Sequence, residues 1–491
     1  MKKILLIIIL FSLAFGFNSC SKDYFDVNTP SGTASDEQIG MSELLAPVIY
    51  HSFRAEYYAE RSFGNYSQNF TGQDGAAYGK TSNSGTWTNI YLYVLPNLKV
   101  IIDKADEKNA THYKAVAEIL TAMNIGLATD SWDWIPYSES AMGSANIHPA
   151  FDSQESVYNS IFSLLDDAIG KLEAADNSGY TVGGEDIAYG GDMSKWLKLA
   201  YTLKARYQLH IYYKTSGNIN DIISNLDNGF TSNADDFQIF YDSRNINPWY
   251  SREILARATG NSHDEMGDQL VSYMNGASYP FTGGTITEDP RLSVYAEKDV
   301  PSDPWRGYVS GGNGLSSDGN NANAHFKTDG FYTSEGAPVV YISYAEAEFM
   351  RAEAEFIKNG GNATSVGSSQ AAYDAYINGI TANFDKLGVA STDYLADPSI
   401  AVTPAGLKLE HIMKEKYIAN FLNPETYVDL RRYDFSTDVF KDLALPDDNA
   451  SSEFPGQWLV RADYPGSEES ANKDNVNAHK ESPVTPVWWA Q

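Results

Sequence analysis

A helical period dominates this chain from residue 41 onward. Apolar side chains recur at three-and-four spacing in segment after segment, which is typical of helices that bury one face. These segments cover residues 41–66, 87–108, 111–130, 153–175, 192–215, 341–360, 368–388 and 407–434. The pattern predicts a mainly α fold. Ser153 and Asp192 stand where the N-caps of two of these helices are expected.

Small residues recur where neighbouring helices would touch. Ala345, Ala347, Ala352 and Ala354 lie in one predicted helix, and the next contains Ala371, Ala372 and Ala375. Small side chains let paired helices approach closely, as in tetratricopeptide pairs. No strict 34-residue repeat is present. The spacing alone therefore leaves an irregular helical bundle open as the alternative.

Residues 230–335 lack the helical period. They are rich in Gly, Asn, Asp, Pro and aromatic residues, as in VPSDPWRGYVSGGNGLSSDGNNANAHF. A segment this long exceeds an ordinary loop. We expect a loop-rich insertion that carries function, inside a single helical domain of residues 41–491.

The N-terminus has the form of a lipoprotein export signal. Lys2 and Lys3 precede an apolar run over residues 4–17, which is too short to span a bilayer comfortably. Cys20 is the only cysteine, so an internal disulfide is excluded. The sequence predicts a signal peptide over residues 1–19, acylation of Cys20, and a polar tether over residues 20–40. A plain secreted protein is the alternative.

The charge balance restricts the class of partner. There are 64 Asp+Glu against 35 Lys+Arg, a net charge of -29. Such a chain has few cationic side chains that could release counterions from a phosphate backbone, so a nucleic-acid partner is nearly excluded. Charge-driven binding to anionic lipid is disfavoured for the same reason.

The motif search finds no catalytic constellation. H-E-x-x-H, G-x-S-x-G and a complete EF-hand loop are all absent, so no metal site or cofactor is predicted, although Asp/Asn-rich loops leave a structural calcium open. The segment Asp74–Thr81 resembles a phosphate loop but begins with Asp74 in place of glycine. Glycoside hydrolysis needs only two suitably spaced carboxylates, and no spacing singles out such a pair.

Aromatic residues in polar loops are the remaining functional signal. Tyr, Phe and Trp make up 13% of the chain. A flat ring covers the apolar face of a sugar while nearby polar groups bind its hydroxyls. The candidate ligand-binding residues are Tyr78, Trp87, Trp249, Tyr250, Trp305 and Tyr308. The alternative for each is that it anchors its loop to the helical body.

Several segments in order resemble the SusD/RagB family, and its SusD-like branch in particular. They extend over almost the whole mature chain. They are CSKD at residues 20–23 with DVNTP, LATDSWDWIPYSES, DMSKWLKLAYTLKARYQLH, DPRLSVYA, YISYAEAEFMRAEAEF, EKYIANFLNPETYVDLRRYD, and RADYPGSEESANKDNVNA with a final VWW.

The resemblance implies about four tetratricopeptide-like helical pairs and a loop-rich ligand face. It also implies a lipoprotein of the outer membrane, exposed at the cell surface, that is not an enzyme. Its partner would be a SusC-like TonB-dependent transporter, to which it delivers captured oligosaccharides. The Trp87 loop and residues 240–330 resemble the segments that bind glycan, whereas Trp132 and Trp134 belong to a structural signature.

Three hypotheses follow from the sequence. The first is a non-catalytic, surface-anchored protein that binds oligosaccharides for a transporter. The second is a peptide-capturing lipoprotein with the same partner, because a fold does not decide its ligand. The third and weakest is a glycosidase with two acids in residues 240–330.

Overall fold

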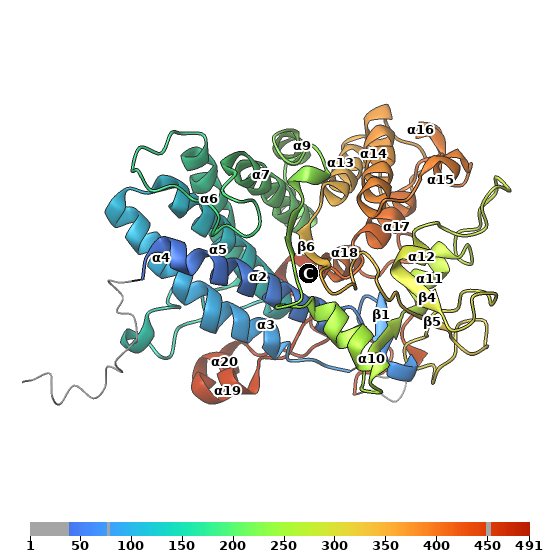
Figure 1. Cartoon of the computed structure of the whole chain (residues 1–491), viewed down its shortest axis with the longest axis horizontal. Coiled ribbons are helices and arrows are strands. Elements are labelled where there is room, and N and C mark those ends of the chain that lie inside the picture. The colour runs from blue at the N-terminus through green and yellow to red at the C-terminus, as the bar shows by residue number, and fades with distance from the viewer. Residues whose placement is uncertain (1–38, 76–78, 448–452) are drawn as a thin grey trace, which may run out of the picture. The chain divides into compact units, whose positions relative to one another are not determined.

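The computed structural model describes residues 39–75, 79–447 and 453–491 (Figure 1). Residues Met41–Gln491 form one compact unit. The predicted signal peptide, Cys20, most of the tether and Tyr78 lie outside the described residues, so their predictions stay untested.

The first half of the unit is a series of consecutive helices. Helix α5 packs against α4 and α6, and α7 packs against α6 and α9, so each helix lies beside its sequence neighbours (Figure 1). The helices are α2 (Met41–Phe63), α3 (Ser84–Thr88), the π-helix η4 (Asn89–Val94), α4 (Leu95–Lys108), α5 (Thr111–Trp132), α6 (Gln154–Leu172), α7 (Met193–His210), α8 (Tyr212–Thr215) and α9 (Ile219–Asp227).

The second half continues the pairing after the irregular region. Helix α13 packs against α14 and α17. The elements are α13 (Tyr344–Lys358), α14 (Gln370–Leu387), α15 (Thr392–Ala396), α16 (Thr403–Gly406), α17 (Leu409–Ala419), α18 (Glu425–Arg432), α19 (Gly466–Ala471) and α20 (Lys473–His479). The predicted mainly α fold of tetratricopeptide-like helical pairs is confirmed.

Small residues lie at the helix contacts, as predicted. Ala345, Ala352, Ala372 and Ala375 are buried, whereas Ala371, in the first turn of α14, is exposed. A glycine allows the closest approach in this pair. A Cβ atom on Gly379 would lie 2.7 Å from the Phe349 ring. Helices α13 and α14 therefore pack more closely than larger side chains would permit.

The irregular region consists of short elements. They are β2 (Phe237–Phe240), the π-helix η7 (Tyr250–Leu255), α10 (Ala256–Ala258), β3 (Asp264–Met266), α11 (Asp268–Met274), α12 (Leu292–Tyr295), β4 (Ala296–Lys298), β5 (Ala324–Phe326) and β6 (Pro338–Ile342). Short 3-10 turns are η3 (Gln73–Gly75), η5 (Gly143–Ala145), η6 (Asn233–Asp235) and η9 (Trp488–Ala490).

Antiparallel strand pairs organise this region, and one of them connects it to the segment that follows α2. Strand β1 (Phe70–Gly72), which follows α2, pairs with β3 so that Phe70 is opposite Met266. Strands β2 and β6 form a second pair, and β4 and β5 a third. The β1–β3 pair places the start of the polar loop after α2 beside residues nearly 200 positions later in the chain.

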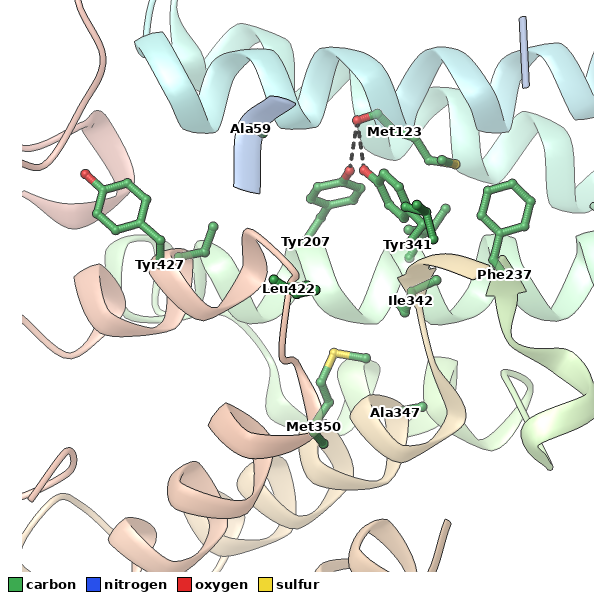
Figure 2. Close-up of a cluster of buried hydrophobic side chains, with 14 of the residues drawn as sticks. Ala59, Met123, Tyr207, Phe237, Tyr341, Ile342, Ala347, Met350, Leu422 and Tyr427 are labelled. Atoms are coloured by element: carbon green, nitrogen blue, oxygen red, sulfur yellow. Dashed lines mark hydrogen bonds between the residues drawn. The ribbon is translucent and has the colours of Figure 1, made fainter. Parts of the chain in front are cut away.

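The core lies where helices from both halves meet β6 (Figure 2). The Tyr207 hydroxyl from α7 and the Tyr341 hydroxyl from β6 both donate to the Met123 carbonyl of α5, at 3.4 and 3.2 Å. Both rings are buried. Two buried hydroxyls are thus satisfied at one helical carbonyl, which holds β6 against α5 and α7.

Local chemistry explains the helix boundaries. Ser153 caps α6 by accepting a hydrogen bond from the Ser156 N–H, and Asp192 caps α7 by accepting from the Ser194 N–H, so both predicted N-caps are confirmed. The predicted helix over residues 407–434 divides into α17 and α18. The backbone between them turns at Leu422, whose φ is 60°.

Candidate functional site

A surface cleft of about 790 Å³ runs along α2. Its walls come from the solvent-facing side of α2, the segment that leads into η4, strand β1 and Asp264 of β3. The described lining residues are Tyr50, His51, Arg54, Tyr58, Arg61, Ser62, Asn65, Tyr66, Phe70, Gly72, Gly79, Thr81, Ser82, Asn83, Ser84, Gly85, Thr88, Asn89, Tyr93 and Asp264. Phe70 is the one wholly apolar side chain among them.

One face of α2 supplies a row of polar aromatic and cationic side chains. Tyr50, Arg54, Tyr58 and Arg61 follow one another at intervals of three or four residues, which places them on the same side of a helix. The opposite side buries Val48, Ile49 and Phe53 among other residues. Burial of the apolar side therefore directs the Arg/Tyr row outward.

Arg54 and Tyr58 form a fixed pair in the middle of this row. Arg54 Nη2 donates to the Tyr58 hydroxyl at 2.9 Å, and the guanidinium carbon lies 5.0 Å from the Tyr58 ring centroid. Gly85 makes room for this ring, because a Cβ atom there would lie 2.5 Å from it. The position of Tyr58 thus depends on a glycine in the opposite wall.

A second aromatic surface crosses from α2 to η4. The His51 and Tyr93 rings stack with centroids 4.3 Å apart and planes inclined by 18°. Asn89 donates a hydrogen bond through Nδ2 to the Gly85 carbonyl, which leaves its Oδ1 directed at His51. The His51 Nδ1–H donates to this Oδ1 at 2.8 Å. The Tyr93 side chain is 40% exposed, which leaves ring surface for a ligand.

The π-helix η4 explains this placement. A π-turn carries one extra residue per turn relative to an α-helix, and such turns recur at functional sites. Here η4 contains both Asn89 and Tyr93. Residues 87–108, predicted to be one helical segment, divide among the end of α3, η4 and α4, and Pro96 stands in the first turn of α4.

The loop wall is organised by Asn83. Its Oδ1 accepts from the Ser62 hydroxyl at 3.1 Å and from the Thr86 hydroxyl at 2.7 Å. Its φ of 46° is left-handed, a conformation that asparagine tolerates. Tyr66 donates to the Gly79 carbonyl at 2.8 Å. These contacts fasten residues 79–86 to α2.

Asp264 is the one carboxylate among the described lining residues. Arg252 Nη2 lies 3.4 Å from Asp264 Oδ1, and the Asp264 N–H donates to Glu253 Oε2 at 2.6 Å. Burial raises the pKa of Asp264 and raises that of Glu253 further. The acidic side of the cleft is therefore partly neutralised.

The structure places Trp87 and Trp249 behind the cleft walls. Trp87 is 6% exposed and meets Trp132 edge-on at 5.0 Å. Trp249 is 2% exposed and packs on Tyr57 at 4.8 Å and on Phe70 at 5.7 Å. The expectation of exposed rings is corrected here, because the apolar bodies of both indoles complete the core beneath the site.

Trp305 and Tyr308 do not line the cleft. Both are buried, and Trp305 lies under Lys298, whose Nζ is 4.5 Å from the ring centroid. The Tyr308 N–H donates to the Met266 carbonyl at 2.8 Å. Tyr250 is half-buried in η7 and is also not part of the wall. Direct ligand contact by any of these residues stays a prediction that the structure does not test.

Sequence reasoning missed the α2 row because a helix with polar residues on one side is ordinary. The usable signal was the composition of that side: His, Arg and Tyr in place of the Lys and Glu of a solvated face. Trp132, predicted to be structural, is buried and donates through Nε1 to the Asp463 carbonyl at 2.9 Å.

Two further features bear on the kind of site. Among the described residues, no group of three or more His, Cys, Asp or Glu side chains is arranged to hold a metal ion. No helix in that part of the chain combines the length and apolar composition needed to cross a membrane.

The chain is thus an array of paired helices with an open, aromatic and polar cleft along α2. The chain belongs to the SusD-like family described as starch-binding and associating with the outer membrane, whose model matches residues 33–465. The resemblance seen in the sequence is thereby confirmed.

Solved structures agree with this fold. A SusD/RagB family protein from Bacteroides thetaiotaomicron is 24% identical with a TM-score of 0.70, covering 92% of this chain and 99% of its own. A chitin-binding protein is 24% identical with a TM-score of 0.72 over 92% and 100%. A chitin-binding SusD homolog from Flavobacterium johnsoniae is 20% identical with a TM-score of 0.70 over 92% and 98%. No curated protein matches the chain.

Proposed function

We propose that this protein is a non-catalytic binding lipoprotein that captures oligosaccharides in the α2 cleft. The observation that carries the proposal is the combination of tyrosine rings with serine, threonine and asparagine side chains around one open cleft. Rings cover the apolar face of a sugar, and the neutral polar groups bind its hydroxyls. The starch-binding description of the family and two chitin-binding structural neighbours support the same ligand class.

The proposal includes the setting of the binding step. Cys20 would be acylated and hold the chain on the outer membrane at the cell surface, and a SusC-like TonB-dependent transporter would receive the captured glycan. The outer-membrane association of the family supports this arrangement. Copurification of the lipidated protein with a barrel transporter tests the delivery step.

The absence of a catalytic pair in the cleft supports binding rather than hydrolysis. Glycosidases place two carboxylates on either side of the scissile bond. Among the described lining residues Asp264 has no such counterpart, since Glu253 lies buried behind it.

Removal of an exposed ring tests the site. Tyr93→Ala deletes stacking surface without opening the core, so we expect glycan binding to weaken by about 1–3 kcal/mol in calorimetry over a polysaccharide panel. Tyr180→Ala is the matched control, because Tyr180 is 44% exposed and does not line the cleft. Equal affinities of the two variants for the bound glycan would contradict the site assignment.

A further inference from the structure

The charge of the cleft is opposite to that of the chain. The whole sequence has a net charge of -29. Yet Arg54 and Arg61 line the cleft, and Asp264 is the one described carboxylate in its wall. At physiological ionic strength charges beyond about 8 Å are screened. A ligand in the cleft therefore responds to these nearby cations more than to the distant acidic surface.

The two arginines differ from most others in the chain. In the part of the sequence that the structure describes, neither Arg54 nor Arg61 forms an ion pair, and Arg54 instead rests on Tyr58. By contrast, the arginines with ion-paired carboxylates are Arg206, Arg252, Arg257, Arg291, Arg306, Arg351, Arg432 and Arg461. The chain has ample acid to neutralise Arg54 and Arg61, and its fold leaves both available.

Their spacing fits an extended ligand. Seven residues of helix separate Arg54 from Arg61, which is about 10 Å along the axis at the usual rise per residue, and both lie on the same face. Tyr58 lies between them. The cleft thus offers an aromatic surface flanked by two cations along one line.

The acid at one end of the cleft is shared between two cations. Arg252 lies 3.4 Å from Asp264, so Asp264 already has a cationic partner outside the described cleft wall. Burial raises the pKa of Asp264, whereas the charges of Arg252 and Arg61 lower it. Arg61 itself is exposed at that end of the cleft.

We propose that the oligosaccharide bound here is anionic and carries carboxylate or sulfate groups that Arg54 and Arg61 bind. This inference rests on the proposed glycan-binding function. A guanidinium presents parallel N–H groups that match the oxygens of either anion, and such charge-assisted hydrogen bonds are stronger than neutral ones.

The lining favours an acidic glycan over an acidic peptide. Peptides are recognised through pockets for apolar side chains, through strand pairing or, when they are acidic, through clusters of arginine. Phe70 is the only wholly apolar side chain among the described lining residues, and hydroxyl and amide groups predominate. Such groups suit a ligand that presents many hydroxyls.

The test compares chains that differ only in charge. Calorimetry of the mature protein is performed with oligogalacturonate and with its carboxyl-reduced form, and with a sulfated galactan oligosaccharide and its desulfated form. We expect at least about tenfold tighter binding of one or both anionic ligands, with an affinity that falls as NaCl rises from about 50 to 500 mM. The arm that binds identifies the anion as carboxylate or sulfate.

Charge-removing variants locate the effect. R54Q/R61Q should lose the preference for the anionic form and its salt dependence, so that the neutral and anionic forms bind this variant with equal affinity. R54K retains the charge but not the planar fork, so it should keep part of the preference. Arg351→Gln removes the same charge from α13, outside the cleft, and should change nothing. Circular dichroism confirms that each variant is folded.

The outcomes separate the two proposals. Equal affinity for neutral and anionic forms would overturn the inference about charge and leave glycan binding intact. Tighter binding of an acidic peptide than of any glycan would overturn it in favour of a peptide ligand. Failure of every glycan in the panel would contradict the proposed function itself.

Discussion

At the scale of single residues, burial separates the aromatic side chains into two groups. Trp87, Trp249 and Trp305 are nearly inaccessible, whereas Tyr93 remains exposed beside His51. An indole is large and mostly apolar, so a tryptophan in a polar loop gains most by packing against the body of the protein. The exposed ring of Tyr93 instead belongs to the wall of the cleft.

Truncation of Trp249 should therefore affect stability first. Trp249→Ala removes a buried indole that contacts Tyr57 and Phe70, and we expect the free energy of unfolding to fall by about 3–5 kcal/mol. Denaturant unfolding measures this loss. Trp249→Phe keeps most of the apolar volume and should lose less. A fully stable Trp249→Ala with impaired glycan binding would instead show that the ring contacts ligand directly.

At the scale of elements, the N-caps of α6 and α7 could be predicted and the π-helix could not. Ser153 and Asp192 act through hydrogen bonds to N–H groups two or three residues away, which are local in sequence. Helix α3 ends at Thr88 and η4 begins at Asn89, so no loop marks the boundary between them. η4 packs on α2, and periodicity along the chain does not reveal this contact.

Removal of the α7 N-cap tests whether its hydrogen bond stabilises the start of the helix. Asp192→Ala leaves the Ser194 N–H without its partner, and we expect a loss of about 1 kcal/mol in the free energy of unfolding. Asp192→Asn retains an oxygen that accepts this bond and should be nearly neutral. Urea unfolding of the two variants, compared with the parent protein, measures the difference. Equal losses in both would show that charge, and not the cap, stabilises the start of α7.

At the scale of the whole molecule, buried ion pairs join distant segments. Arg291, just before α12, lies 2.6 Å from both Asp289 and Glu415, and it donates to Asn383 of α14 at 2.9 Å. Arg206 of α7 similarly pairs with Glu346 of α13 at 2.6 Å. These contacts connect the irregular region to the second half of the helices and the two halves to each other.

The Arg291 cluster predicts a defined response to pH. Burial alone would raise the pKa of Glu415, but the Lys414 and Arg291 charges outweigh it and lower that pKa to about 2. The unfolded chain then binds more protons at mildly acidic pH, so this contribution to stability is complete above about pH 4.5 and is lost as the pH falls toward 2. Thermal or denaturant unfolding across this range should show the loss.

A variant separates this cluster from general acid sensitivity. Arg291→Met leaves Asp289 and Glu415 buried without that partner, and we expect the free energy of unfolding to fall by about 3–5 kcal/mol at neutral pH. The difference in free energy of unfolding between this variant and the parent protein should decrease as the pH falls. Arg351→Met breaks a pair with the exposed Asp227 and should cost about 1 kcal/mol or less. A difference between Arg291→Met and the parent protein that does not change with pH would contradict the role assigned to Glu415.

Local order along the chain sufficed for the mainly α fold, the paired helices, the irregular region and the N-caps of α6 and α7. Periodicity, small contact residues and capping side chains all act between positions a few residues apart, so they can be recognised in the amino-acid sequence. The segments that resemble the SusD/RagB family also identified the particular helical fold.

Packing between remote segments decided which side chains line the cleft. Trp249 is covered because Tyr57 and Phe70 come to lie against it, and the Arg54–Tyr58 row forms a cleft wall because residues 79–89 and Asp264 close around α2. Exposure of a side chain is a property of its three-dimensional neighbours, and these neighbours are up to about 200 positions away in the chain.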